Sequence, residues 1–142
     1  MSAPFSKRPG EAFPRGALTE GFGWGLLLAA FAVGFGILGL TPSLSWIPEV
    51  PLLAAGVAGP VVILAVAGVR AASRSGLVRS GGLAGAVAGA MGGTAGGLCY
   101  LAYGKPAVNI AAGLLVGWLG GGLVGGLAGL VVHRSAMGRG DG

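Results

Sequence analysis

The chain has 142 residues, of which 54% are hydrophobic and only 9% are charged, with a formal net charge of +5. Soluble domains carry about 25% charged residues, so this composition excludes a water-soluble globule, whose surface it cannot cover with polar groups. It also excludes a disordered chain, which is rich in charge, and a collagen, because the 32 glycines follow no G-X-Y period. We therefore predict an integral membrane protein.

Four uncharged apolar runs are long enough to cross the hydrocarbon core, which takes about 20 helical residues. The third run is the weakest, because small residues outnumber its bulky ones. We predict an all-α fold, an integral membrane bundle of four helices. The expected spans are residues 22–40, 50–69, 81–104 and 108–132.

These spans divide the chain into a basic arm (1–20), a transmembrane domain (21–133) and a short tail (134–142). A cleaved signal peptide is the competing interpretation of the first span. The apolar run is longer than a typical signal core, and Thr41–Pro42 gives no clear small-x-small cleavage site. We therefore expect the first span to be retained.

The distribution of Lys and Arg predicts the orientation of the spans. The arm, the second connection and the tail hold eight of these residues, whereas the first and third connections hold only Lys105. Basic residues gather on the cytoplasmic side, so we expect both termini in the cytoplasm and the spans in a bacterial inner or plasma membrane. Arg70, Arg74 and Arg79 of the second connection are candidates for contacts with anionic headgroups, although topology alone also explains them.

Two glycine rows are the strongest pattern in the sequence, one in each of the last two spans. Glycine at every fourth position leaves a groove along a helix, which lets another helix approach closely. A short Lys105–Pro106–Ala107 connection makes these spans antiparallel neighbours. We predict that the rows face each other near their middle, either in a right-handed crossing or with each row serving two partners. The helix-packing residues are Gly81, Gly85, Gly89, Gly93 and Gly97 in the third span, and Gly113, Gly117, Gly121, Gly125 and Gly129 in the fourth.

Pro60 lies in the middle of the second span, with Gly56 four residues earlier. Proline removes one backbone donor and its ring collides with the preceding turn, so we expect a kink there. A small residue at position 56 relieves that collision. We interpret this kink as structural rather than as a gate.

The residues needed for most catalytic chemistry are missing from the expected spans, which hold no Asp, Glu, Lys, Arg or His. We therefore expect no catalytic, metal or cofactor site, no identifiable small-molecule substrate and no binding of nucleic acid. Two G-x-G-x-x-G matches lie inside apolar helices, where no dinucleotide site forms. Cys99 is expected to pack, Trp118 to pack in the bundle or contact lipid, and Asn109 to help cap the fourth span.

The stretches AASRSGLVRSGGLAGAVAG (71–89) and LLVGWLGGGLVGGLAG (114–129) carry a resemblance that covers roughly residues 20–133. The chain resembles small four-span bacterial membrane proteins with a glycine-zipper C-terminal half. The resemblance implies the fold and brings no activity.

Three functions remain open from the sequence. The first is a structural or accessory membrane protein that associates, through its GxxxG faces, with a second copy or a larger membrane complex. The second is a small homo-oligomeric channel, for which a polar pore lining is missing. The third is an enzyme acting on lipid, which we rank last because no acid, base or metal cluster accompanies it.

Overall fold

The computed structural model describes residues 15–40 and 49–137, and these residues form four α-helices. Most of the expected arm and the last residues of the expected tail lie outside the described residues. Each helix is long and apolar enough to cross a membrane, which confirms the all-α class and the four candidate spans. The helices are α1 (Arg15–Leu40), α2 (Glu49–Ser75), α3 (Val78–Ala102) and α4 (Val108–Met137).

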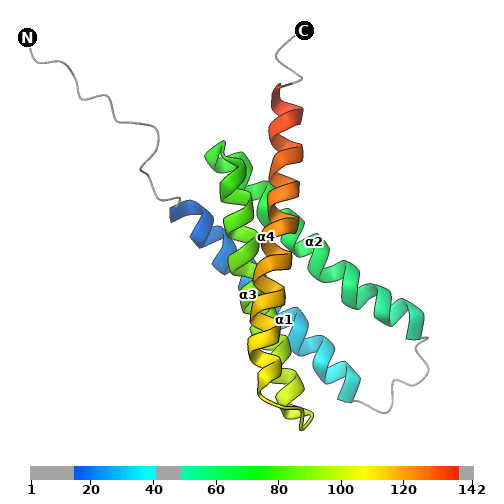
Figure 1. Cartoon of the computed structure of the whole chain (residues 1–142). Helices are drawn as coiled ribbons and strands as arrows, with labels where there is room; N and C mark the ends of the chain where they lie inside the picture. The colour runs from blue at the N-terminus through cyan, green and yellow to red at the C-terminus, as the bar shows by residue number, and fades with distance from the viewer. Residues whose placement is uncertain (1–14, 41–48, 138–142) are drawn as a thin grey trace, which may run out of the picture.

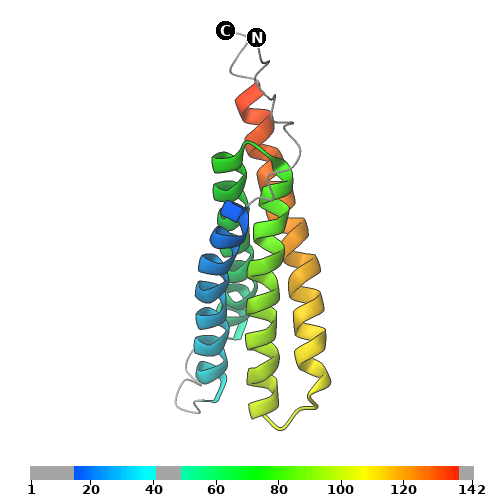
Figure 2. The same ribbon diagram turned by 90° about the vertical axis from the view of Figure 1, so that its left-hand side faces the viewer.

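The four helices form an elongated bundle in which α3 and α4 run side by side as an antiparallel hairpin (Figures 1 and 2). The contact between α3 and α4 is the most extensive of the bundle, followed by that of α1 with α3. Helices α1 and α2 lean away from the hairpin toward the end of the bundle where α3 turns into α4 (Figure 1).

Two glycines with positive φ make the tight turns that fold the last three helices together. Gly104 (φ 72°) follows α3, and its N–H donates to the carbonyl of Leu101, while the N–H of Lys105 donates to that of Tyr100. This 5→2 and 6→1 pair is the Schellman arrangement, which needs a left-handed residue where glycine has no steric penalty. Gly76 (φ 70°) ends α2 in a similar way, with its N–H donating to Ala72.

The helices extend beyond the apolar runs at the end of the bundle that carries most of the arginines. Helix α1 already begins at Arg15, inside the segment expected as an arm, and α2 continues past Val69 to Ser75. Arg70 and Arg74 therefore lie on the last turns of a helix rather than in a loop. The α2–α3 connection shrinks to Gly76 and Leu77, because the left-handed glycine reverses the chain at once.

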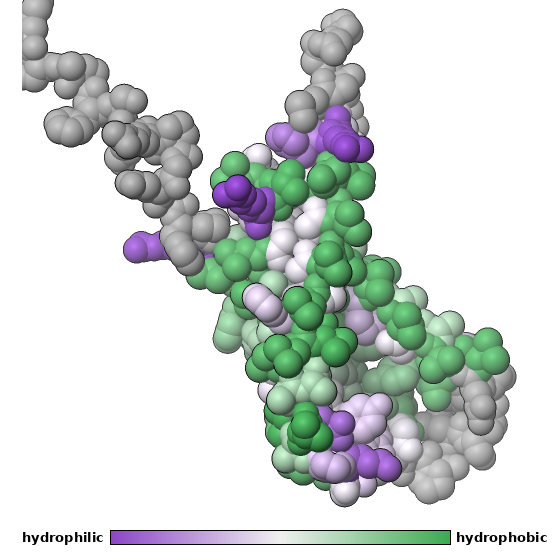
Figure 3. All heavy atoms as spheres, in the orientation of Figure 1, coloured by the Kyte–Doolittle hydropathy of each residue, from purple (hydrophilic) through white to green (hydrophobic). Residues whose placement is uncertain are grey.

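The distribution of side chains is inverted relative to a water-soluble bundle. The buried core is small and rich in alanine, with Ala67, Ala84 and Ala88 almost wholly covered, whereas most Leu and Val side chains of α4 are exposed. The space-filling view shows this apolar surface between two ends that bear hydrophilic side chains (Figure 3). Such a surface is compatible with hydrocarbon as the surrounding solvent.

Candidate functional site

The backbones of α3 and α4 come closest along the two glycine rows. A Cβ built on Gly89 would overlap the carbonyl oxygen of Gly117, and one built on Gly117 would overlap that of Gly89. The same reciprocal relation joins Gly85 with Gly121 and Gly93 with Gly113. In each glycine, the Hα that takes the place of Cβ therefore points at a carbonyl oxygen of the other helix. This is the arrangement of Cα–H···O contacts, worth about 0.5–1 kcal/mol each.

The ends of the two rows meet other partners. A Cβ on Gly81 would lie 2.8 Å from the carbonyl oxygen of Gly125 and 2.9 Å from that of Gly68 on α2. A Cβ on Gly129 would lie 3.1 Å from the Cβ of Ala72, also on α2. Helix α2 therefore crosses the hairpin at the end of the rows that contains Gly81 and Gly129.

At the opposite end of the rows, Gly97 lies against the start of α4. A Cβ on Gly97 would lie 2.6 Å from the Cα of Ile110 and 2.7 Å from the carbonyl oxygen of Asn109. The backbone contact between α3 and α4 thus continues from Gly81 to the first turn of α4.

Helices α1 and α2 meet through aromatic rings that lie over glycines. Phe31 and Phe35 of α1 stack with their ring centroids 5.5 Å apart. A Cβ on Gly56 would lie 2.9 Å from the Cε1 of Phe35, and one on Gly59 would lie 2.6 Å from the Cζ of Phe31. Gly56 therefore accommodates a ring from α1, a role that its spacing from Pro60 did not reveal.

A cavity of about 730 Å³ lies between these aromatic rings and the hairpin. All four helices contribute to its wall, which is mainly apolar, and the space-filling view shows a hollow beside this part of the hairpin (Figure 3). Pro60 lies in the wall, and α2 continues as a helix on both sides of it. Gly96 and Gly120 also line the cavity, and a Cβ built on either would meet no atom within 4 Å.

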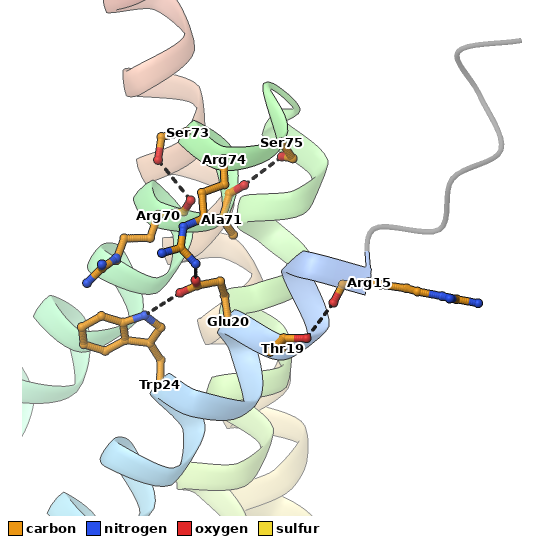
Figure 4. A network of polar contacts seen from close by, with 9 residues as sticks. All are labelled: Arg15, Thr19, Glu20, Trp24, Arg70, Ala71, Ser73, Arg74 and Ser75. Carbon is orange, nitrogen blue, oxygen red and sulfur yellow. Dashed lines mark hydrogen bonds and ion pairs between the residues drawn. The ribbon is translucent and has the colours of Figure 1, made fainter. Parts of the chain in front are cut away.

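A polar cluster joins α1 to α2 at the arginine-rich end of the bundle (Figure 4). Glu20 is 15% exposed and accepts hydrogen bonds from Arg74 Nη1 and, at 3.2 Å, from Trp24 Nε1. The guanidinium of Arg70 lies over the Trp24 ring, with its Cζ 5.8 Å from the centroid. The carboxylate is thus held by two donors while the indole contacts a cation, an arrangement that fixes how α1 meets α2.

We expect Glu20→Gln to lower the free energy of unfolding by less than about 1 kcal/mol, because the Arg74 side chain is 65% exposed and solvent screens its charge. A double-mutant cycle with Arg74→Gln, measured by unfolding in mixed micelles at low and high salt, isolates the pair. Arg79→Gln at the same end is the matched control. A coupling that is independent of salt would contradict a screened ion pair.

The structure also places the other residues named in the sequence analysis, which are Arg79, Cys99, Asn109 and Trp118. Arg79 is exposed near the start of α3. The Sγ of Cys99 lies 4.0 Å from the carbonyl oxygen of Ala32 and in the cavity wall. Asn109 Nδ2 donates to the carbonyl of Pro106 at 3.0 Å, and Trp118 is 51% exposed on α4. Trp118 is not among the residues that line the cavity.

Neither the cavity nor the contacts of Glu20 were predicted from the sequence. Glu20 is the last residue of the segment expected as an arm, yet it lies one turn before Trp24 on the same helix. A possible signal was the spacing of four between Glu20 and Trp24, which places both side chains on one face. Among residues 15–40 and 49–137 there is no group of three His, Cys, Asp or Glu side chains that could hold a metal ion.

Comparison with known proteins gives no assignment for this arrangement: no family model, curated protein or solved structure matches the chain.

Proposed function

We propose that this chain is a non-catalytic, multi-pass membrane protein with a structural or accessory role, which associates in the bilayer with a second copy or a larger membrane complex. The glycine rows are its internal packing interface, since the backbones of α3 and α4 leave no room for a Cβ between them. Association with a partner must therefore use a face outside these rows.

The observation that carries the proposal is a strip of small residues beside the hairpin seam. Gly82, Gly122 and Gly126 are only half-buried. Built Cβ atoms on these three would meet α3 or α4 at 3.5 Å or more and would meet no atom of α1 or α2 within 4 Å. A strip of this kind lets a further helix backbone approach, as small residues do in membrane helix packing.

We also propose that the protein lies in a cell membrane with both termini of the chain in the cytoplasm. The first turn of α1, the α2–α3 turn and the end of α4 lie at one end, and this end holds Arg15, Arg70, Arg74, Arg79 and Arg134. Lys105 lies at the other end. A green fluorescent protein fused after Gly142 should fluoresce if the orientation is correct, whereas activity of an alkaline phosphatase fused there would overturn it.

Native mass spectrometry of the full chain, extracted from its own membranes in mild detergent, tests the association. We expect an oligomer or a complex with another membrane protein, and we expect Gly122→Leu to release the monomer. Gly34→Leu is the control, because a Cβ there meets no atom within 4 Å and the position lies on α1, outside the strip.

A wild-type chain that is strictly monomeric and co-purifies with no other membrane protein would contradict the proposal. Retention of the complex by Gly122→Leu would exclude the strip as its interface. Dye or ion flux from proteoliposomes of the purified chain would instead favour the channel alternative.

A further inference from the structure

Two kinds of residue line the cavity between the hairpin and helices α1 and α2: glycines and large apolar side chains. Gly96 and Gly120 leave part of it open, since a Cβ at either position meets nothing within 4 Å. Phe31, Phe35 and Leu64 supply apolar side chains from α1 and α2. The volume of about 730 Å³ lies within the range of about 300–1,000 Å³ that is typical of small-molecule sites.

Polar side chains gather at the end of the cavity where α3 turns into α4. Tyr100, Tyr103 and Lys105 all line this end. The hydroxyl of Tyr103 donates to the carbonyl of Gly36 and so joins α3 to α1 at the rim. Tyr100 is 58% exposed, and its hydroxyl has no hydrogen-bond partner among the residues that the structure describes.

Lys105 gives this rim a positive charge, and the ion pair between Arg74 and Glu20 lies at the opposite end of the bundle. Glu49 is the first residue of α2, and among the described residues Lys105 is the one charged side chain that lines the cavity. The site is therefore apolar in its depth and cationic at one edge, at the level of a membrane interface where Lys and Tyr are favourable.

We propose that the cavity binds an acyl chain of an anionic phospholipid, with the headgroup phosphate against Lys105 Nζ and the Tyr100 hydroxyl. The apolar wall takes the chain because leaving it empty forfeits dispersion contacts on both sides. The charge at the rim selects an anionic over a zwitterionic headgroup. The inference does not depend on the accessory role proposed above, since it concerns a different face of the bundle.

Two variants remove the two parts of the site separately. Gly96→Phe adds a ring at a position of the cavity wall where a Cβ meets nothing within 4 Å, so the ring should occupy part of the cavity rather than the seam between α3 and α4. Gly34→Phe makes the same change on α1, where a Cβ also meets nothing and the position does not line the cavity. Lys105→Gln removes the charge, and Tyr100→Phe removes a hydroxyl while retaining the ring.

The test uses the full chain in phosphatidylcholine nanodiscs that contain phosphatidylglycerol with a diazirine on its acyl chain. Phosphatidylcholine with the same photoactivatable chain is the reference probe. After irradiation, mass spectrometry of the peptides locates the crosslinks. Thermal unfolding of each variant in detergent verifies that it remains folded, and Gly120→Phe replaces Gly96→Phe if the latter does not.

We expect phosphatidylglycerol to crosslink to the cavity wall in preference to phosphatidylcholine. Lys105→Gln should lower this preference about fivefold, the effect of one basic residue near a headgroup. Gly96→Phe should lower crosslinking of both probes about tenfold, the contact of about two methylene groups, and Gly34→Phe should leave it unchanged.

Equal crosslinking of the two probes, or a preference that survives both Lys105→Gln and Tyr100→Phe, would overturn the anionic selectivity and with it the proposal. Crosslinks spread evenly over the outer faces, unchanged in Gly96→Phe and Gly120→Phe, would overturn the cavity as the binding site. Neither result depends on whether the chain associates with a partner.

Discussion

Replacing Gly89 with leucine is expected to separate α3 from α4 and to lower the free energy of unfolding by more than about 3 kcal/mol. Even the first carbon of the new side chain would overlap the carbonyl oxygen of Gly117. That obstacle is backbone, which cannot rotate away as the end of a flexible side chain can. Gly121→Leu should have the same effect from the other helix, because its Cβ would overlap the carbonyl oxygen of Gly85. Unfolding in mixed micelles measures both variants.

Gly96→Leu is the matched control for this experiment, since it makes the same change seven residues along the same helix, where a Cβ meets nothing within 4 Å. Leu115→Ile on the exposed side of α4 should also have little effect. If Gly89→Leu, Gly96→Leu and Leu115→Ile unfolded at the same denaturant concentration, the seam would not be the packing interface of the hairpin.

Replacing Gly68 with valine is expected to detach α2 from the hairpin while α3 and α4 stay together, at a cost of about 2–3 kcal/mol. A Cβ on Gly68 would lie 2.5 Å from the Cα of Gly125 and would overlap its carbonyl oxygen. The loss should be smaller than for Gly89→Leu, because the contact of α2 with α4 is less extensive than that of α3 with α4.

A disulfide between α2 and α4 reports this detachment directly. A Cβ on Gly129 lies 3.1 Å from that of Ala72, close to the spacing of about 3.5–4.5 Å in a disulfide. The pair Ala72→Cys and Gly129→Cys, made in a Cys99→Ser chain, should therefore oxidise readily. Adding Gly68→Val should prevent the disulfide, whereas Ala58→Val at an exposed position of α2 should not. Undiminished oxidation with Gly68→Val would show that the helix tolerates the valine in place.

The four spans could be predicted from the sequence because membrane insertion depends mainly on local composition. An uncharged run of about 20 apolar residues must satisfy its peptide groups internally, and helix formation does this without help from distant residues. The ends of the helices were harder to predict. Arg15, Arg70 and Arg74 are charged and fall outside the apolar runs, yet all three lie in helices. Arg74 pairs with Glu20 and Arg70 lies over the Trp24 ring, and these contacts between α1 and α2 could not be predicted from local composition.

The number and kind of the helices and the two rows of glycine can be predicted from the sequence, since both depend only on residue type and on spacing along the chain. The packing of the helices was needed to show that Gly89 faces Gly117, that Gly68 meets Gly125, and that a cavity bounded by Phe31 and Phe35 lies beside Gly96. A glycine row shows where another helix can approach closely, but it does not specify which helix packs there. The cavity results from the tilt of α1 and α2 away from the hairpin, and no local sequence pattern predicts the direction of that tilt.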